Sequence, residues 1–258
     1  MTLASFMKKF VYVPERAGYI GIEREAFIAD CRGQIIAAAP RVLAPLAGGN
    51  EEFGYELSAC QIETRIGPVV IDAVSDALTE NDAHLNGLLG AHGLTPLHAE
   101  VGPEDMPLDV YPDPTGRYAA LTRDMPRDVL LSACRVIGTH IHVGMPSHGI
   151  ALLVYNHIVT HTPRLCGMGD GSEGARLAIY RQMAPESDPM PYASWRAFYA
   201  AAQAQGFAED PRKCWTFVRI SVHGTLEFRM FGATDSLLKI ESWTRECHGL
   251  CMDALEHI

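Results

Sequence analysis

Polar and apolar side chains alternate most regularly in residues 217–232, where two alternating segments meet at Gly224. Alternation of this kind predicts a β-hairpin, because successive side chains of a strand point to opposite faces of a sheet. We predict a three-residue loop, Val222-His223-Gly224, with the glycine in the left-handed conformation that such loops favour. A two-residue loop would mix polar and apolar side chains on each face, so we reject it.

This loop places Arg219 opposite Glu227 and Ser221 opposite Thr225. The polar face then carries Arg219, Ser221, Thr225, Glu227 and Arg229, and the apolar face carries Val218, Ile220, Leu226, Phe228 and Met230. A carboxylate between two guanidinium groups fits either a surface ion-pair ladder or a functional site. Carboxylates and histidines that alternate in other segments favour the functional site.

Two further segments carry ionisable groups on one strand face. Residues 20–29 place Glu23 and Glu25 opposite an apolar face that Arg24 interrupts. Like charges on one strand face repel unless a cation or solvent separates them, so a divalent metal and an exposed edge strand are the two explanations. Residues 134–144 place His140 and His142 on one face, where they could bind a metal or a phosphate or be structural.

Glu56 and Glu63 lie in a predicted strand, residues 55–65. Their separation of seven residues puts them on opposite faces of an uninterrupted strand. Both therefore reach one site only across a bulge or a break, and Glu63 is the stronger candidate.

The remaining segments have weaker patterns. Helical spacing predicts helices at residues 71–89, 149–161, 192–205 and 234–258, and a short helix that begins at Gly116-Arg117-Tyr118. Short strands are predicted at 34–39 and 94–99, and loops at 40–53, 101–114 and 185–191. Residues 167–174 are glycine-rich without a Walker motif and predict a flexible lid. Arg117, Arg176 and Arg181 could each hold an anion or face solvent.

Composition narrows the function classes. The 258 residues, 48% of them hydrophobic, fit one large domain. The net charge of −10 argues against a nucleic-acid partner. Long apolar runs and a secretory signal are missing from the sequence, so we predict a cytoplasmic protein without a membrane segment. The seven cysteines are scattered and predict reduced thiols, with Cys247 and Cys251 buried in a helix rather than binding zinc.

Four motifs follow one another along the chain: Gly21-Ile-Glu-Arg-Glu25, Glu56-Leu-Ser-Ala-Cys-Gln-Ile-Glu-Thr64, Gly138-Thr-His-Ile-His-Val-Gly144 and Gly224-Thr-Leu-Glu-Phe-Arg229. With Arg117-Tyr118, Asn156 and Arg181 between them, they resemble the glutamate–cysteine ligase type 2 family of carboxylate–amine ligases. The catalytic domain of glutamine synthetase is a more distant likeness. The resemblance implies an α+β fold, with a curved, mainly antiparallel sheet backed by helices.

The resemblance also implies ATP and Mg²⁺, or alternatively Mn²⁺, on the concave face of that sheet. Its implied metal ligands are Glu23, Glu25, Glu56, Glu63, His140 and Glu227. Its implied nucleotide and phosphoryl contacts are Arg219, Arg229, Arg181 and His142, with Arg219, Arg229 and Glu227 as catalytic residues. Its implied substrate contacts are Arg117, Tyr118 and Asn156.

The chemistry that the resemblance implies is the joining of a small carboxylic acid, such as the amino acid glutamate, to an amine through an acyl phosphate. Carboxylate ligands suit magnesium, and fixed arginines suit the transferred phosphoryl group. A small-molecule phosphotransferase and a non-catalytic nucleotide-binding homologue are the alternatives, and a homo-oligomer is compatible with the sequence. We expect residues 1–258 to form one catalytic domain without the family's C-terminal helical extension.

Overall fold

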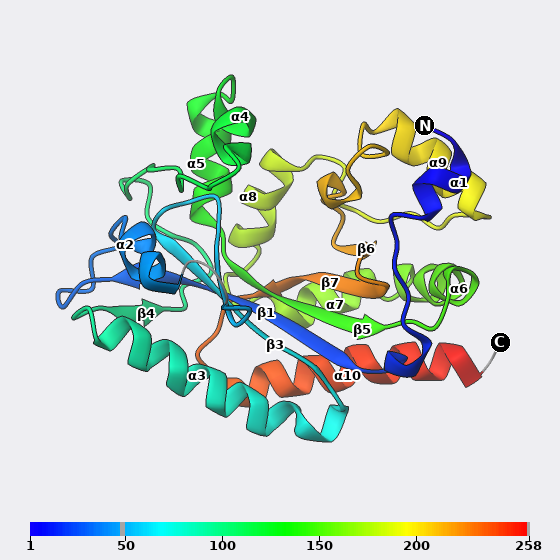
Figure 1. Ribbon diagram of the computed structural model, residues 1–258, viewed down its shortest axis with the longest axis horizontal. Coiled ribbons are helices and arrows are strands. Elements are labelled where there is room, and N and C mark those ends of the chain that lie inside the picture. Colours follow the sequence, from blue (N-terminus) through cyan, green and yellow to red (C-terminus); the bar gives the residue numbers. More distant parts are fainter. Residues whose placement is uncertain (47–49, 257–258) are drawn as a thin grey trace.

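The computed structural model describes residues 1–46 and 50–256, and within them seven strands form one sheet in which the paired strands are antiparallel (Figure 1). The strands are β1 (Ile20–Ala29), β2 (Phe53–Tyr55), β3 (Gln61–Val69), β4 (Thr95–Leu97), β5 (Gly138–Gly144), β6 (Val218–Ile220) and β7 (Thr225–Gly232). Their order is β2-β3-β1-β5-β7-β6, and β4 pairs with the end of β1. This arrangement confirms the predicted α+β fold with a mainly antiparallel sheet.

The β6–β7 hairpin has the predicted register. Arg219 lies opposite Glu227, and the backbone N–H of Ser221 donates to the carbonyl of Thr225 at 2.9 Å. Gly224 has φ +72°, and a Cβ there would lie 2.2 Å from the carbonyl oxygen of Val11. Glycine is therefore required by conformation and by space.

Helices cover one face of the sheet and bury its apolar side chains. These helices are α3 (Val74–Gly90), α6 (His148–Val159), α7 (Thr162–Gly169) and α10 (Leu237–Glu256). The strand residues that meet them include Ile22, Ile141 and Phe228, each at most 1% exposed. Arg24 also points to this side, where its guanidinium pairs with Asp82 of α3 at 2.9 Å. That ion pair explains the charge on an otherwise apolar face.

The remaining helices lie around the other side and the ends of the sheet (Figure 1). They are α1 (Leu3–Met7), α2 (Ala39–Leu43), α4 (Arg117–Thr122), α5 (Arg127–Arg135), α8 (Ala175–Met183) and α9 (Trp195–Ala204). Short 3₁₀ turns occupy Pro14–Arg16, Ala44–Leu46, Ile71–Ala73 and Pro211–Lys213. Helices α5 and α8 pack together, so α4, α5 and α8 form a wall beside the uncovered face.

Several local predictions were wrong. Residues 34–39 contribute a single bridge, Ile35 to Ala29, instead of a strand, and α2 lies within the predicted loop at 40–53. Residues 47–49 of that predicted loop lie outside the described residues. The strand predicted at residues 55–65 is divided into β2 and β3 and continues to Val69, and α5 was not predicted.

The glycine-rich segment 167–174 also differs from the predicted lid. Its first three residues end α7, and a tight turn follows. The Asp170 carboxylate accepts hydrogen bonds from the backbone N–H groups of Ser172 and Gly174, which defines the turn.

Cys247 and Cys251 are fully buried in α10, which confirms their predicted place in the core, and the seven cysteines are free thiols. Among the described helices, none is both long and apolar enough to cross a membrane.

Candidate active site

The uncovered face of the sheet brings the predicted ionisable side chains into one row. Glu23 of β1 lies opposite His140 of β5, and His142 lies opposite Glu227 of β7. On the other side of β1, Glu25 lies opposite Glu63 of β3. The two-residue period of each strand and the antiparallel register together place these groups on one face.

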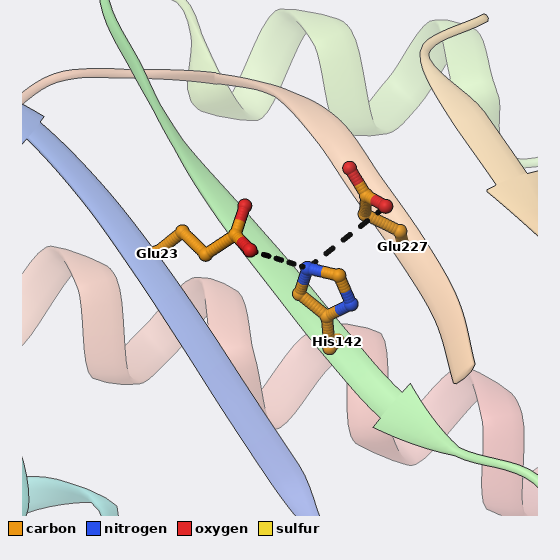
Figure 2. Close-up of side chains that lie close together, drawn as sticks. All are labelled: Glu23, His142 and Glu227. Atoms are coloured by element: carbon orange, nitrogen blue, oxygen red, sulfur yellow. Dashed lines mark ion pairs between the residues drawn. The ribbon is translucent and has the colours of Figure 1, made fainter. Parts of the chain in front are cut away.

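A first cluster of possible metal ligands consists of Glu23, His142 and Glu227 (Figure 2). The Nε2 atom of His142 lies 3.6 Å from Glu23 Oε1 and 3.9 Å from Glu227 Oε2, distances too long for hydrogen bonds. Nδ1 lies 2.8 Å from the hydroxyl of Thr225, whereas the buried Nε2 has no hydrogen-bond partner in the described part of the chain. Three ligand atoms that surround a gap in this way suit a cation.

Charge agrees with this geometry. Burial opposes the charged form of His142, but the carboxylates of Glu227 and Glu23 outweigh burial and raise its pKa. Burial likewise disfavours ionised Glu23, yet the neighbouring histidines hold its pKa well below the usual range. The cluster therefore attracts positive charge.

A second cluster consists of Glu25, Glu56 and Glu63, with one oxygen of each within 4.8 Å of the others. The strand is interrupted between β2 and β3. The sequence predicted that Glu56 and Glu63 could share a site only across such an interruption, and the structure places them together. Burial and the nearby Glu23 carboxylate raise the pKa of Glu63 to about 7, and burial and Glu63 raise that of Glu56 well above its usual range. Glu56 and Glu63 cannot both ionise cheaply without a cation.

The residues of both clusters fit magnesium. Five of the six groups offer hard carboxylate oxygens, the ligands that this ion prefers. His140 lies between the clusters, with Nδ1 3.1 Å from Glu23 and Nε2 3.7 Å from Glu25. The geometry thus favours His142 over His140 as a metal ligand, the reverse of the roles expected from the sequence.

Glu227 is also the centre of a buried Arg–Glu–Arg arrangement. The carboxylate is 0% exposed, and it accepts from Arg219 Nε at 2.7 Å and from Arg229 Nη1. Burial alone would raise the pKa of Glu227, but Arg219 and Arg229 outweigh it and hold the pKa far below its ordinary value. Glu227 therefore stays ionised and fixes both guanidinium groups.

These groups line one pocket of about 540 Å³ that also reaches Arg117 and Tyr118 of α4. Arg65, Trp215 and His223 are among the lining residues that were not predicted as site residues. Arg65 follows Glu63 by two residues on the same strand face and pairs with it at 2.5 Å, so alternation alone could have identified it. Trp215 and His223 lie in irregular segments, where no periodic signal exists.

Arg181 and Asn156 do not line this pocket, which contradicts the positions expected for a nucleotide contact and a substrate contact. Arg181 pairs with Asp188 at 3.1 Å, and its guanidinium lies 5.0 Å from the centre of the Phe217 ring. The amide of Asn156 exchanges two 2.8 Å hydrogen bonds with the backbone of Tyr192. Both side chains thus have partners outside the pocket.

Arg176 reaches the pocket but is occupied by the backbone. Its buried guanidinium donates to the carbonyls of Ile137, Met230 and Arg229. These hydrogen bonds connect the residue before β5 to the bulged part of β7. They also satisfy the guanidinium donors, which offsets the cost of burying an arginine.

In metal-free protein, the melting temperature should fall as the pH rises from about 5 to about 8. The folded state binds extra protons at Glu63, whose pKa is about 7, and at Glu56, whose pKa is also raised. Stability that is present below the unfolded pKa is therefore lost as the pH rises through the folded pKa. His142, with its raised pKa, acts in the same direction, whereas Glu23 and Glu227 have lowered pKa values and stay ionised.

Magnesium should remove most of this fall, because it binds the ionised carboxylates. Melting curves across this pH range with EDTA or with magnesium measure the effect. A slope that is the same in both conditions would contradict a metal site in the second cluster.

Comparisons with known proteins agree with this geometry. No family model matches the chain. A glutamate–cysteine ligase of Natronomonas pharaonis is 26% identical over 235 residues, covering 83% of this chain and 64% of that protein. A protein named putative glutamate–cysteine ligase 2 in Pseudomonas paraeruginosa is 29% identical over 241 residues, covering 84% of this chain and 62% of the relative. The chain thus spans less than two thirds of the length of these relatives.

Solved structures show the same fold at low sequence identity. A bifunctional glutathione synthetase from Pasteurella multocida superposes with a TM-score of 0.56 and 13% identity, over 92% of this chain and 39% of that one. Glutamine synthetase from Plasmodium falciparum superposes with a TM-score of 0.50 and 11% identity, over 93% of this chain and 52% of that one. These likenesses confirm the predicted fold of the glutamine synthetase catalytic type.

Proposed function

We propose that this chain, a relative of the glutamate–cysteine ligase type 2 proteins, is an ATP- and Mg²⁺-dependent ligase that joins a small carboxylic acid to an amine. The observation that carries the proposal is the adjacency of three features in one pocket: two clusters of possible metal ligands and the buried Arg219–Glu227–Arg229 arrangement. Phosphoryl transfer needs such a combination of metal ligands and fixed guanidinium groups.

In the proposed reaction, a carboxylate oxygen of the acid attacks the γ-phosphorus of ATP, which forms an acyl phosphate and releases ADP. The amine nitrogen then attacks the acyl carbon, phosphate leaves, and the nitrogen loses a proton. Bound magnesium would neutralise charge on the triphosphate. Arg229 and Arg219 would hold the transferred group, and Glu227 keeps their orientation. This route requires no nucleophilic serine or cysteine.

The acid is proposed to be an amino acid such as glutamate. Arg117 and Tyr118 line the pocket near the second cluster, where a guanidinium could hold a carboxylate that does not react. A cytoplasmic location and a homo-oligomer stay predictions, as does the single-domain organisation of residues 1–258.

Incubation with ATP, magnesium and pools of amino acids and amines tests the function. We expect phosphate release that requires both an acid and an amine, and a product whose mass equals that of an amide. The Glu227→Gln variant, purified in the same way, controls for contaminating phosphatases. A stable phosphorylated product would instead indicate a phosphotransferase. ADP formation at the level of the no-substrate control, with nucleotide still bound, would indicate a non-catalytic nucleotide-binding protein.

A further inference from the structure

We propose that Trp215 is a positioning residue, whose indole ring holds the guanidinium of Arg229 in the plane that a phosphoryl group requires. No sequence pattern singled out this residue. The kinetic part of the proposal rests on the ligase function proposed above, whereas the contact itself can be tested without any substrate.

The guanidinium of Arg229 makes an aromatic contact besides its ion pair with Glu227. Its Nη1 donates to the Glu227 carboxylate, but its Nε is buried and has no hydrogen-bond partner among the described residues. The Tyr180 hydroxyl is a second polar neighbour of the guanidinium, and an aromatic contact adds to these two. The Cζ atom of Arg229 lies 5.5 Å from the centre of the Trp215 ring, within the range of a cation–π contact. The ring therefore supplies a further constraint on the orientation of the guanidinium.

The exposure of Trp215 fits a role in the pocket better than one in the core. Its side chain lines the pocket and the residue is 37% exposed, whereas Trp195 and Trp243 are 8% and 6% exposed. A large aromatic ring left this open in a pocket contributes less to folding than a buried one. The ring is well placed to contact other side chains that line the pocket.

The backbone that carries the ring is anchored to the same site. Arg219 Nη1 donates to the carbonyls of Arg212 and Cys214, each at 3.0 Å. The hydroxyl of Tyr180 donates to the carbonyl of Trp215, also at 3.0 Å. Since Arg219 is itself held by Glu227, the contacts form a closed circuit from Glu227 through Arg219, the backbone at 212–215 and the indole to Arg229. One carboxylate thus contacts both arginines directly, and the indole of Trp215 gives Arg229 a second contact.

Acrylamide quenching of tryptophan fluorescence tests the contact in the ligand-free protein. Comparison of the unmodified protein with Trp215→Phe identifies the signal of Trp215. We expect Arg229→Lys to increase the quenching of that signal, because a lysine cannot cover the indole face as a planar guanidinium does. Arg164→Lys, at an exposed ion pair on α7, is the matched control and should leave quenching unchanged. Quenching that is unaltered by Arg229→Lys would overturn the proposal, whatever the activity.

A double-mutant cycle tests the positioning role. Trp215→Leu should lower kcat about tenfold with little change in KM, and Trp215→Phe, which keeps an aromatic face, should retain most of the activity. In the Arg229→Lys background, Trp215→Leu should cause little further loss, because both changes disturb the same group. The positioning role would be overturned if the losses of kcat from Trp215→Leu and Arg229→Lys multiplied in the double variant. It would also be overturned if Trp215→Phe and Trp215→Leu lowered kcat equally. Failure of the proposed ligase function would appear differently, as no turnover in the unmodified protein.

Discussion

Replacement of Glu227 by glutamine should lower kcat by about a thousandfold and destabilise the fold by about 3–5 kcal/mol. The carboxylate is fully buried between Arg219 and Arg229, so its loss leaves two guanidinium groups without their shared partner. It also removes a ligand atom from the cluster with Glu23 and His142. Steady-state kinetics and urea unfolding of the same preparation measure the two effects.

Glu241→Gln is a matched control for this experiment. It removes a carboxylate from an exposed pair with Arg245 on α10, which should cost about 0.3–0.5 kcal/mol and leave turnover unchanged. Because Glu227→Gln changes stability as well as activity, kcat must be expressed per folded molecule. If the folded fraction of Glu227→Gln were fully active, Glu227 would be a structural ion-pair partner and the proposed active site would be wrong.

Arg229→Lys should cost about 2–4 kcal/mol of transition-state stabilisation, seen mainly as a lower kcat and much less as a higher KM for ATP. Lysine keeps the positive charge near Glu227 but lacks the planar fork that holds two phosphoryl oxygens. Measurement of kcat and KM across ATP concentrations separates these contributions. An unchanged kcat with a raised KM would mean that Arg229 contacts ATP only in the ground state.

Arg181→Lys provides the comparison for this prediction. Arg181 was expected from the sequence to bind the nucleotide, but it lies outside the pocket and pairs with Asp188. Its replacement should therefore leave kcat within about twofold of the unmodified protein, as is usual for surface substitutions. A large loss of kcat in Arg181→Lys would instead support the nucleotide contact that the sequence predicted for Arg181.

Much of the sheet could be predicted from the sequence because its signals are local. The alternation in β1, β5 and β7 fixes which side chains share a face, and Gly224 fixes the hairpin loop. The register that places Arg219 beside Glu227 follows from these two facts without any knowledge of the rest of the chain. The prediction failed at residues 34–39, where a short apolar run makes only a single bridge to β1.

The carboxylates predicted as metal ligands lie close together in the structure, but the sequence did not predict how they group into two clusters. Sequence spacing shows that Glu56 and Glu63 need a break in the strand, and the resemblance to ligases brought them to one site. Neither shows that His142, rather than His140, completes the cluster with Glu23 and Glu227. That choice depends on the stagger between β1, β5 and β7, which is a property of strand pairing.

By itself, the sequence determined the face on which each strand residue lies, since a strand repeats every two residues whatever its neighbours are. Only the tertiary structure decided which distant groups meet. Arg181 and Asn156 lie outside the pocket, because their positions on α8 and α6 place them beside Asp188 and Tyr192. Trp215 lines the pocket although it lies in an irregular segment, because hydrogen bonds from Arg219 and Tyr180 hold the backbone of that segment there. Contacts between segments far apart in the chain have no local period, so no pattern along the sequence encodes them.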